Sequence, residues 1–530
     1  MKNFGKKFIF ITGGVLSSLG KGLTGASIGA LLECMGYRVS FLKLDPYLNV
    51  DPGTMSPHQH GEVFVTTDGA ETDLDLGHYE RFTHATLRAE NSITAGKLYA
   101  QLIEKERKGD FLGSTIQIVP HLTDAIKQAI YNASSSSDFT LVEIGGTVGD
   151  IEGLPFIEAI RQMGLYENRS NCLYIHLTYV PYLKMAQELK TKPTQHAVKA
   201  LSSLGIQPDI LICRSEIALS QETKDKISLF TNVQASAIIS APDLETIYEL
   251  PLYLAEQQLP QVIARCMRLD YKAPALEKWQ TIVTTLKTLD KHITVAIVGK
   301  YTATQDAYKS LYEALLHAQI ATRVKIKIVW VDSEQLTQEN HASQLKDSSA
   351  IIVPGGFGGR GVEGKIIAVR YARENNIPFL GICLGMQIAV IEFARTMLNL
   401  PLAHSTEFME TSQPVIDVMA DQKWVTHKGG SMRLGAQTCA IKPATLAHAI
   451  YQQSHISERH RHRYEFNSRY ADRFAQAGFI ISGSDATNNL PEIIEIPGHK
   501  HFIACQFHPE LQSKPFAPHP LFVSLIQATL

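Results

Sequence analysis

Three residues in the C-terminal half carry side chains that together can perform nucleophilic catalysis. Cys383 lies in Gly381-Ile-Cys383-Leu-Gly385, a G-x-C-x-G pattern in which the glycines permit a tight turn ahead of a helix. A thiol of pKa ~8.5 is only about 3% ionised at pH 7, and a helix dipole shifts this by less than about one pKa unit. A base is therefore required. His508 and Glu510, in an HPE tripeptide near the end of the chain, would supply the base and the group that orients it.

A second group of residues, in the N-terminal half, has the composition of a phosphate-binding loop. The run Ile11–Gly22 (ITGGVLSSLGKG) lies between an apolar strand pattern and a helical pattern, where backbone N–H groups face anionic oxygens. It differs from the common P-loop in spacing and in placing Gly22 where a Ser or Thr usually binds magnesium. Carboxylates from elsewhere would then hold Mg²⁺, and Asp75 and Glu143 are the candidates.

Each of these signals is weak when taken alone. A single buried cysteine after a strand is more often an inert core residue, and a GKG tripeptide is more often a surface turn. A single carboxylate is more often solvated. The joint occurrence of Cys383 with the distant HPE tripeptide is what favours chemistry.

Short apolar runs that alternate with helical patterns would position these residues. They are Phe8–Thr12, Val39–Leu44, Phe139–Ile144, Cys172–Leu177, Ile210–Cys213, Thr294–Gly299, Lys325–Val331, Ala350–Pro354 and Pro378–Ile382. Strands that are apolar throughout and alternate with helices indicate parallel sheets covered on both faces. The predicted fold class is α/β, with two parallel-sheet, three-layer domains.

The length of 530 residues favours two domains over one core. Residues 269–292 carry mixed charge and a proline and lack strand character, which is typical of a helical linker. The predicted domains are therefore residues 1–268 and 293–530.

Composition excludes several classes of protein. Hydrophobic residues make up 45% and charged residues 19% of the chain, as in folded globular proteins. A formal net charge of -2 gives no electrostatic reason to expect nucleic acid or membrane partners. The seven cysteines form no CxxC pair, which favours reduced thiols. The first apolar run is too short for a signal peptide or membrane span, so we expect a soluble, cytoplasmic protein.

The cysteine motif and the HPE tripeptide together resemble the class I glutamine amidotransferases. A third element agrees, because Val353–Gly358 (VPGGFG) follows a strand and matches the loop that forms the oxyanion hole in that family. Carried over by motif, the resemblance implies glutamine contacts from Gly356, Leu384, Gly385, Met386, Gln387, Glu407 and Arg463.

Longer segments across nearly the whole chain resemble the CTP synthase family. They are Lys43–Pro57, His60–Val65, Asp68–Arg81 (DGAETDLDLGHYER), Val142–Glu152 (VEIGGTVGDIE) and Lys190–Gln195 (KTKPTQ). The resemblance implies an N-terminal amidoligase domain of the dethiobiotin-synthetase type and a C-terminal flavodoxin-like glutaminase domain. It also implies ATP-dependent amination of UTP to CTP, with nitrogen from glutamine or free ammonia, through a 4-phosphorylated UTP intermediate and internal passage of ammonia.

The same resemblance implies the nucleotide contacts. ATP would be held by Ser18, Leu19, Gly20, Lys21, Gly22, Leu23, Asp75, Pro242, Asp243 and Leu244, although a lysine is frequent in the family where this chain has Pro242. UTP or CTP would be held by Ser17, Asp150, Ile151, Glu152, Lys190, Thr191, Lys192, Pro193, Thr194, Gln195 and Lys226. Mg²⁺ would be held by Asp75 and Glu143.

Regulation and assembly are also implied by the resemblance. The family is activated by GTP and inhibited by CTP, and forms homotetramers and filaments. The glycine-rich stretch Gly358–Gly364 around Arg360 would close over the glutamine site when GTP binds; the other interpretation is a mobile surface loop.

Two alternatives remain at this point. One is another ATP-dependent amidotransferase, such as a cobyric-acid-type amidase, which would lack the KTKPTQ and DPYLNVDPGTMSP segments. The other is a non-catalytic assembly protein, against which Cys383, His508 and Glu510 argue.

Overall fold

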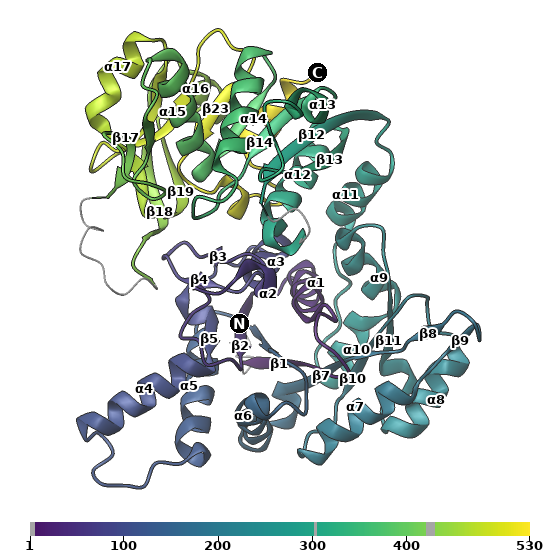
Figure 1. Cartoon of the computed structure of the whole chain (residues 1–530). Coiled ribbons are helices and arrows are strands. Elements are labelled where there is room, and N and C mark those ends of the chain that lie inside the picture. Colours follow the sequence, from purple (N-terminus) through teal and green to yellow (C-terminus); the bar gives the residue numbers. More distant parts are fainter. Residues whose placement is uncertain (1–5, 301–304, 420–429) are drawn as a thin grey trace. The chain divides into compact units, whose positions relative to one another are not determined.

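The computed structural model describes residues 6–300, 305–419 and 430–530. The chain forms two compact units (Figure 1). The first comprises Met1–Pro52 and Asp75–Thr284, and the second comprises Gly53–Leu74 and Thr285–Leu530. The sequence predicted an unbroken N-terminal domain, whereas residues 53–74 pack with the second unit. No helix in the described ranges combines the length and apolar character that a membrane crossing requires.

The first unit is built on a seven-stranded sheet in the order β11-β10-β7-β1-β6-β2-β5. All of its neighbouring strands run parallel. The strands are β1 (Lys7–Gly13), β2 (Val39–Asp45), β5 (Ser92–Thr94), β6 (Phe139–Ile144), β7 (Cys172–Tyr179), β10 (Ile210–Ser215) and β11 (Ile238–Pro242). Every residue of β1 and β6 is buried, as the apolar runs predicted for strands covered on both faces.

Helices cover both faces of this sheet. Residues of α4, α5, α6 and α7 share one core cluster with β1, β2 and β6. Helix α1 also contacts β1, β2 and β6, and packs against α3 and α9. The helices of this unit are α1 (Lys21–Cys34), α3 (Asp75–Phe82), α4 (Ala95–Lys108), α5 (Thr123–Ala133), α6 (Leu154–Tyr166), α7 (Lys192–Ser203), α8 (Gln221–Thr231), α9 (Leu250–Glu256) and α10 (Leu259–Cys266). Helix α11 (Glu277–Lys287) lies in the predicted linker and spans the boundary between the units.

The second unit has a nine-stranded sheet in the order β13-β12-β14-β15-β23-β22-β21-β18-β19. The strands from β13 to β23 in this order are parallel, and the remaining ones are antiparallel. The strands are β12 (Lys291–Gly299), β13 (Val324–Asp332), β14 (Ala350–Val353), β15 (Phe379–Ile382), β18 (Arg433–Ile441), β19 (His455–His462), β21 (Ile480–Asp485), β22 (Pro491–Glu495) and β23 (Phe502–Cys505). The predicted parallel sheet is therefore extended by an antiparallel half.

Two core clusters lie on this second sheet. One contains residues of α13, α14, α15 and α17, and the other contains residues of α12, α16 and α18. These helices are α12 (Lys309–Thr322), α13 (His341–Leu345), α14 (Val362–Glu374), α15 (Leu384–Met397), α16 (Leu446–Tyr451), α17 (Ala471–Gln476) and α18 (Pro520–Gln527). A small sheet of β16 (Ala403–Ser405), β17 (Gln413–Val418) and β20 (Tyr464–Phe466) completes the unit.

The segment Gly53–Leu74 is fastened to the second unit by backbone and side-chain bonds. It contains α2 (Pro57–His60) and the hairpin of β3 (Phe64–Val65) and β4 (Glu71–Thr72). Arg459 Nη1 donates to Val65 O at 3.0 Å, and Ala436 N donates to Thr67 O at 2.9 Å. Strands β18 and β19 therefore hold this segment in place.

Candidate active sites

Cys383 occupies the sharp turn between β15 and α15. Its φ of 50° is a left-handed value that L residues with a Cβ rarely adopt. The flanking glycines leave room for the turn, because a Cβ on Gly385 would lie 2.0 Å from Val353 O and one on Gly381 would lie 2.8 Å from Gly385 O. The residue is only 3% exposed. The predicted strand–cysteine–helix arrangement is present.

His508 and Glu510 lie in the loop after β23, and the imidazole is paired with the carboxylate. His508 Nδ1 lies 2.7 Å from Glu510 Oε1. Burial would lower the pKa of His508, but Glu510 and Cys383 outweigh burial and raise it to about 10. The other ring nitrogen, Nε2, is buried, and the Cys383 thiol is close enough to the ring to help raise the pKa of His508. It is the nitrogen that is left to exchange a proton.

Gly355 brings the predicted oxyanion loop against both partners. A Cβ at this position would lie 2.8 Å from His508 Cε1 and 3.6 Å from Cys383 Cβ. The loop is held farther along by Glu407, whose Oε1 accepts from Gly358 N at 2.7 Å, and by the Lys300 ammonium, which donates to Phe357 O. The predicted nucleophile, base and oxyanion loop therefore converge.

A cavity of about 290 Å³ opens at this point, close to the lower end of the size range of small-molecule pockets. Its wall includes Cys383, His508, Glu510 and the loop Pro354–Phe357. Part of the wall comes from the segment Gly53–Leu74, through Gly53, Thr54, Met55, Pro57, Glu62 and Val63. Sequence reasoning assigned those residues to the N-terminal domain and did not place them here.

The predicted glutamine contacts are placed unevenly around this cavity. Gly356 lines it, and a Cβ on Gly356 would lie 3.5 Å from Leu384 Cδ2. Met386 belongs to the core cluster beneath α14 and α15. Gln387 Nε2 donates to Tyr464 O at 2.9 Å, and Arg463 Nη2 donates to Ser431 Oγ at 2.9 Å.

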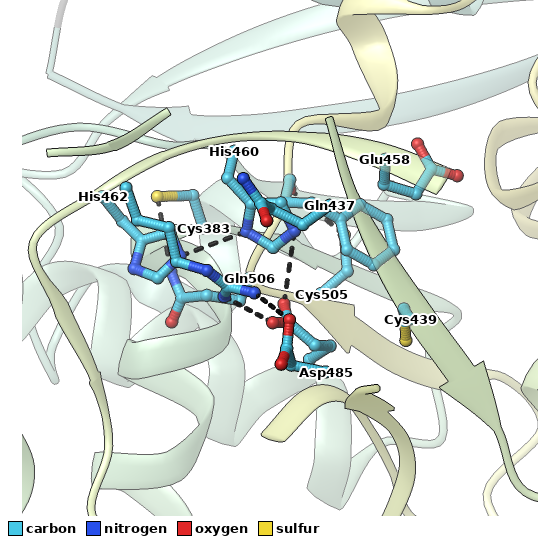
Figure 2. Close-up of polar contacts among 12 residues, drawn as sticks. Cys383, Gln437, Cys439, Glu458, His460, His462, Asp485, Cys505 and Gln506 are labelled. Atoms are coloured by element: carbon cyan, nitrogen blue, oxygen red, sulfur yellow. Dashed lines mark hydrogen bonds and ion pairs between the residues drawn. The ribbon is translucent and has the colours of Figure 1, made fainter. Parts of the chain in front are cut away.

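Two residues beside Cys383 were not singled out from the sequence. The Cys383 thiol donates to Arg461 O at 3.7 Å. Gln506 Nε2 donates to Cys383 Sγ at 3.6 Å (Figure 2). Gln506 immediately precedes Phe507 and His508, so its closeness to the HPE tripeptide was a usable signal. Arg461 also pairs with Glu71 at 2.8 Å and donates to Gly53 O at 2.9 Å.

In the first unit, the predicted metal carboxylates converge on one ammonium group. Lys43 Nζ donates to Asp75 and, at 3.1 Å, to Glu143, and it lies 3.7 Å from Asp45. Burial raises the pKa of Asp45 to about 6 in spite of Lys43, and burial and Asp75 raise the pKa of Glu143. Lys43 and Asp45 were not predicted as site residues. They end β2, and the register that pairs Lys43 with Glu143 on β6 puts them at the same sheet edge.

These carboxylates fit a hard cation only in part. Asp75 and Glu143 already share one cationic partner, as ligands of a single Mg²⁺ would. The described residues contain no group of three or more side chains arranged to hold a metal. Phosphate oxygens and water would have to complete the coordination shell.

The predicted phosphate loop leads from β1 into α1. Gly20 has a φ of 83°, which favours glycine. A Cβ on Gly22 would lie 1.9 Å from Asp75 Oδ1, so glycine is needed for the loop to approach that carboxylate. Lys21 Nζ donates to Gly146 O at 2.8 Å, and burial lowers the pKa of Lys21. The loop, Asp75 and Glu143 therefore lie together.

The predicted nucleotide segments divide into buried and exposed parts. Thr191, Thr194 and Gln195 are buried at the start of α7 and bond within the protein. Lys190 pairs with Glu188 at 2.5 Å, and Ile151 is 81% exposed.

The predicted adenine contacts lie at and just after the end of β11. Arg214 donates to Pro242 O at 3.0 Å and to Asp243 Oδ1 at 2.8 Å. Arg214 is a further residue that sequence reasoning did not identify.

Comparisons with known proteins agree on one family. A family model for the CTP synthase N-terminus matches residues 7–269, and one for class-I glutamine amidotransferases matches residues 303–528. The chain is 57% identical to a CTP synthase of Aquifex aeolicus (strain VF5), over 99% of this chain and 98% of the relative. It is also 57% identical to a CTP synthase of Hydrogenobaculum sp. (strain Y04AAS1), over 98% and 97%.

One solved structure is also similar. It is the glutaminase domain of Trypanosoma brucei CTPS with bound acivicin, which is 38% identical and gives a TM-score of 0.43. The match covers 45% of this chain and 93% of that one. Together, the family models and full-length relatives confirm the predicted resemblance, and the fold described above confirms the predicted α/β class.

Proposed function

The chain belongs to the CTP synthase family of ligases in pyrimidine biosynthesis, and on that premise we propose that it converts UTP to CTP with ATP and glutamine. The observation that carries the nitrogen-supplying half is that Gly355, Cys383 and His508 line one cavity, with Gly355 so close that an added Cβ would lie 2.8 Å from His508, which brings nucleophile, base and oxyanion loop together.

Glutamine hydrolysis would proceed through a thioester. The Cys383 sulfur attacks the side-chain carbonyl of glutamine, and the protonated His508 Nε2 gives its proton to the departing nitrogen, which leaves as ammonia. His508 then takes a proton from water as the water attacks the thioester, and glutamate and the free thiol are released. Glu510 holds the imidazole at Nδ1 throughout.

Within the cavity, we propose that Gly356, Leu384, Gly385, Met386, Gln387, Glu407 and Arg463 contact the glutamine. The carboxylate of Glu407 suits the α-amino group, and the guanidinium of Arg463 suits the α-carboxylate. Burial raises the pKa of Glu407, so a bound ammonium would provide a charge that favours its ionised form.

The first unit would carry out the amidoligase reaction. The terminal phosphoryl group of ATP moves to the 4-oxygen of UTP, which turns a poor leaving group into phosphate. Ammonia then adds at carbon 4 and phosphate leaves. Lys21 and Lys43 would neutralise charge on the transferred group, and a bound Mg²⁺ would supply further charge stabilisation when held by Asp75 and Glu143.

The substrates would occupy the predicted segments. ATP would be held by residues 18–23 with Asp75 and residues 242–244, and the UTP or inhibitory CTP triphosphate by Ser17, residues 190–195 and Lys226. Residues 150–152 would read the base. Ammonia would pass internally from Cys383 to the amidoligase site, and GTP would act as an activator at the loop around Arg360.

We also propose a cytoplasmic homotetramer that assembles further into filaments. An open apolar surface of the first unit supports self-association, because Leu48, Ile103 and Ile151 are each more than half exposed there. Light scattering of the purified chain would test the assembly.

The function itself is tested by incubating the purified protein with UTP, ATP, Mg²⁺ and glutamine. CTP, ADP, phosphate and glutamate should form in equal amounts. Release of ADP without CTP would contradict the proposal.

A further inference from the structure

The carboxamide of Gln506 contacts the sulfur of Cys383, which is the nucleophile of the proposed glutaminase reaction. Gln506 directly follows β23 and lies two residues before His508. It is 1% exposed, and its Nε2 lies 3.6 Å from Cys383 Sγ. Figure 2 shows this contact as a dashed line between the two side chains. The contact is longer than a bond between nitrogen and oxygen because sulfur is a larger acceptor.

A chain of hydrogen bonds fixes which end of this carboxamide faces the sulfur. Tyr464 O can only accept, so the side-chain nitrogen of Gln387 must face it, at 2.9 Å. The same nitrogen donates to Gln506 Oε1 at 3.4 Å. The oxygen of Gln506 is thereby committed to Gln387, and its NH₂ group is directed at Cys383. The backbone of Gln506 is also held, since its N–H donates to Glu492 O at 2.8 Å.

Two cations lie near this site, and each is paired with carboxylates: Arg433 with Asp485 and Glu492, and Arg461 with Glu71. The charged and titratable groups around this site come from β18, β19, β22 and β23 with its following loop: Arg433, His460, Arg461, His462, Glu492, Cys505, His508 and Glu510. Burial lowers the pKa of His462 to about 3 and that of His460 well below its ordinary value, so both rings are neutral at pH 7. His460 Nδ1 and His462 Nε2 are 3.1 Å apart, so these rings bond to each other.

We propose that Gln506 is a dedicated donor that stabilises the Cys383 thiolate, acting opposite the charged His508. In the thiol form, the S–H group donates to Arg461 O. Once the proton has moved to His508, the bond from the thiol to that carbonyl is lost, and the amide of Gln506 becomes the neutral donor that compensates the charge on sulfur. The inference rests on and deepens the proposed glutaminase function, and it names a residue that donates to its nucleophile.

The test is the pH dependence of Cys383 alkylation by iodoacetamide, followed by mass spectrometry of the peptide that contains Cys383. Gln506→Met keeps a straight side chain but removes the donor, and should raise the midpoint of alkylation by about one pH unit, because a bond to a charged group contributes that much or more. Gln437→Met is the matched control, since Gln437 Nε2 donates to Leu434 O on the same sheet and not to sulfur. Its midpoint should equal that of the unmodified protein.

A midpoint for Gln506→Met within about 0.3 pH units of the unmodified protein, or an equal rise in the control, would overturn the proposal. Thermal unfolding establishes that each variant is folded. If Gln506→Met does not fold, Gln506→Leu decides, because it also removes the donor, adds no charge, and should raise the midpoint as far. Alkylation needs no glutamine, so the result stands even if the chain fails to hydrolyse glutamine.

Discussion

Nδ1 of His508 lies 2.7 Å from Oε1 of Glu510, so the carboxylate fixes which ring nitrogen faces the nucleophile. Glu510→Gln removes the negative charge while preserving size. It should lower the rate of glutamine hydrolysis at least about tenfold, because the imidazole is no longer held protonated.

The same pair predicts a pH-dependent stability. The pKa of His508 is raised from 6.5 to about 10, so the stabilisation is fully present below pH 6.5 and is lost as the pH rises through about 10. The free energy of unfolding lost in Glu510→Gln should be largest below pH 6.5 and small above pH 10. Urea unfolding at several pH values measures it, and a loss that grows with pH would contradict the assignment.

Cys383→Ala should separate the two sources of nitrogen. We expect no CTP from glutamine and near-normal CTP from ammonium salts, because the sulfur serves only glutamine hydrolysis. Cys439→Ala, which alters another buried cysteine of the same sheet, is the control and should retain both activities. Equal loss of both activities in a folded Cys383→Ala protein would refute the division of labour.

Glu143→Gln should abolish CTP formation from either nitrogen source, since it removes a charge that Lys43 and the proposed Mg²⁺ share. Glutamine hydrolysis should persist. Glu104 forms an exposed ion pair with Lys108 and provides a control, because Glu104→Gln leaves the cluster around Lys43 intact. Retention of ammonia-dependent synthesis in Glu143→Gln would exclude the proposed role.

Lys365 is fully buried, and its ammonium has no hydrogen-bond partner among the described residues. Burial, with help from Lys300, lowers its pKa from 10.5 to about 7. A lowered lysine pKa penalises the folded state as the pH falls from 10.5, and the penalty is complete below about 7. Lys365→Met should therefore raise the free energy of unfolding at pH 7 by at least about 1 kcal/mol. Lys325→Met, at an exposed position, should not, and the two are compared by urea unfolding.

Arg360 tests the proposed activation by GTP. Its side chain is 57% exposed, and its guanidinium pairs with Glu334 at 2.9 Å. Arg360→Ala should reduce the ratio of glutamine-dependent rates with and without GTP, with ammonia-dependent synthesis unchanged. Arg370→Ala, on the exposed side of α14, should keep the ratio. An unchanged ratio in Arg360→Ala would favour the alternative interpretation, that residues 358–364 form a mobile surface loop.

The strands that carry local signals were predictable. Apolar runs predicted β1, β6, β12 and β15, and the two glycines that flank Cys383 predicted the turn there. The antiparallel strands β18, β19, β21 and β22 were not predicted, because alternating polar sequences such as HISERHRH give no clear apolar run.

Contacts between residues that are far apart in the sequence could not be predicted either. Lys43 meets Glu143 only through the register of β2 on β6, and Gln506 meets Gln387 only because β23 pairs with β15. Neither relationship is encoded in local spacing. The sequence identified Glu143 and Gln387 as site residues but did not identify their partners, Lys43 and Gln506.

Because the segment Gly53–Leu74 belongs to the second unit, a single cut in the chain cannot separate the two units. A polypeptide that begins after Thr284 would keep Cys383, His508 and Glu510 but lose the part of the cavity wall that runs from Gly53 to Val63. Arg461 would lose its partner Glu71. Shortening or lengthening this segment, in an engineered protein or in a naturally fused homologue, would therefore change the shape of the glutaminase pocket. The altered residues would lie some 300 positions before Cys383 in the sequence.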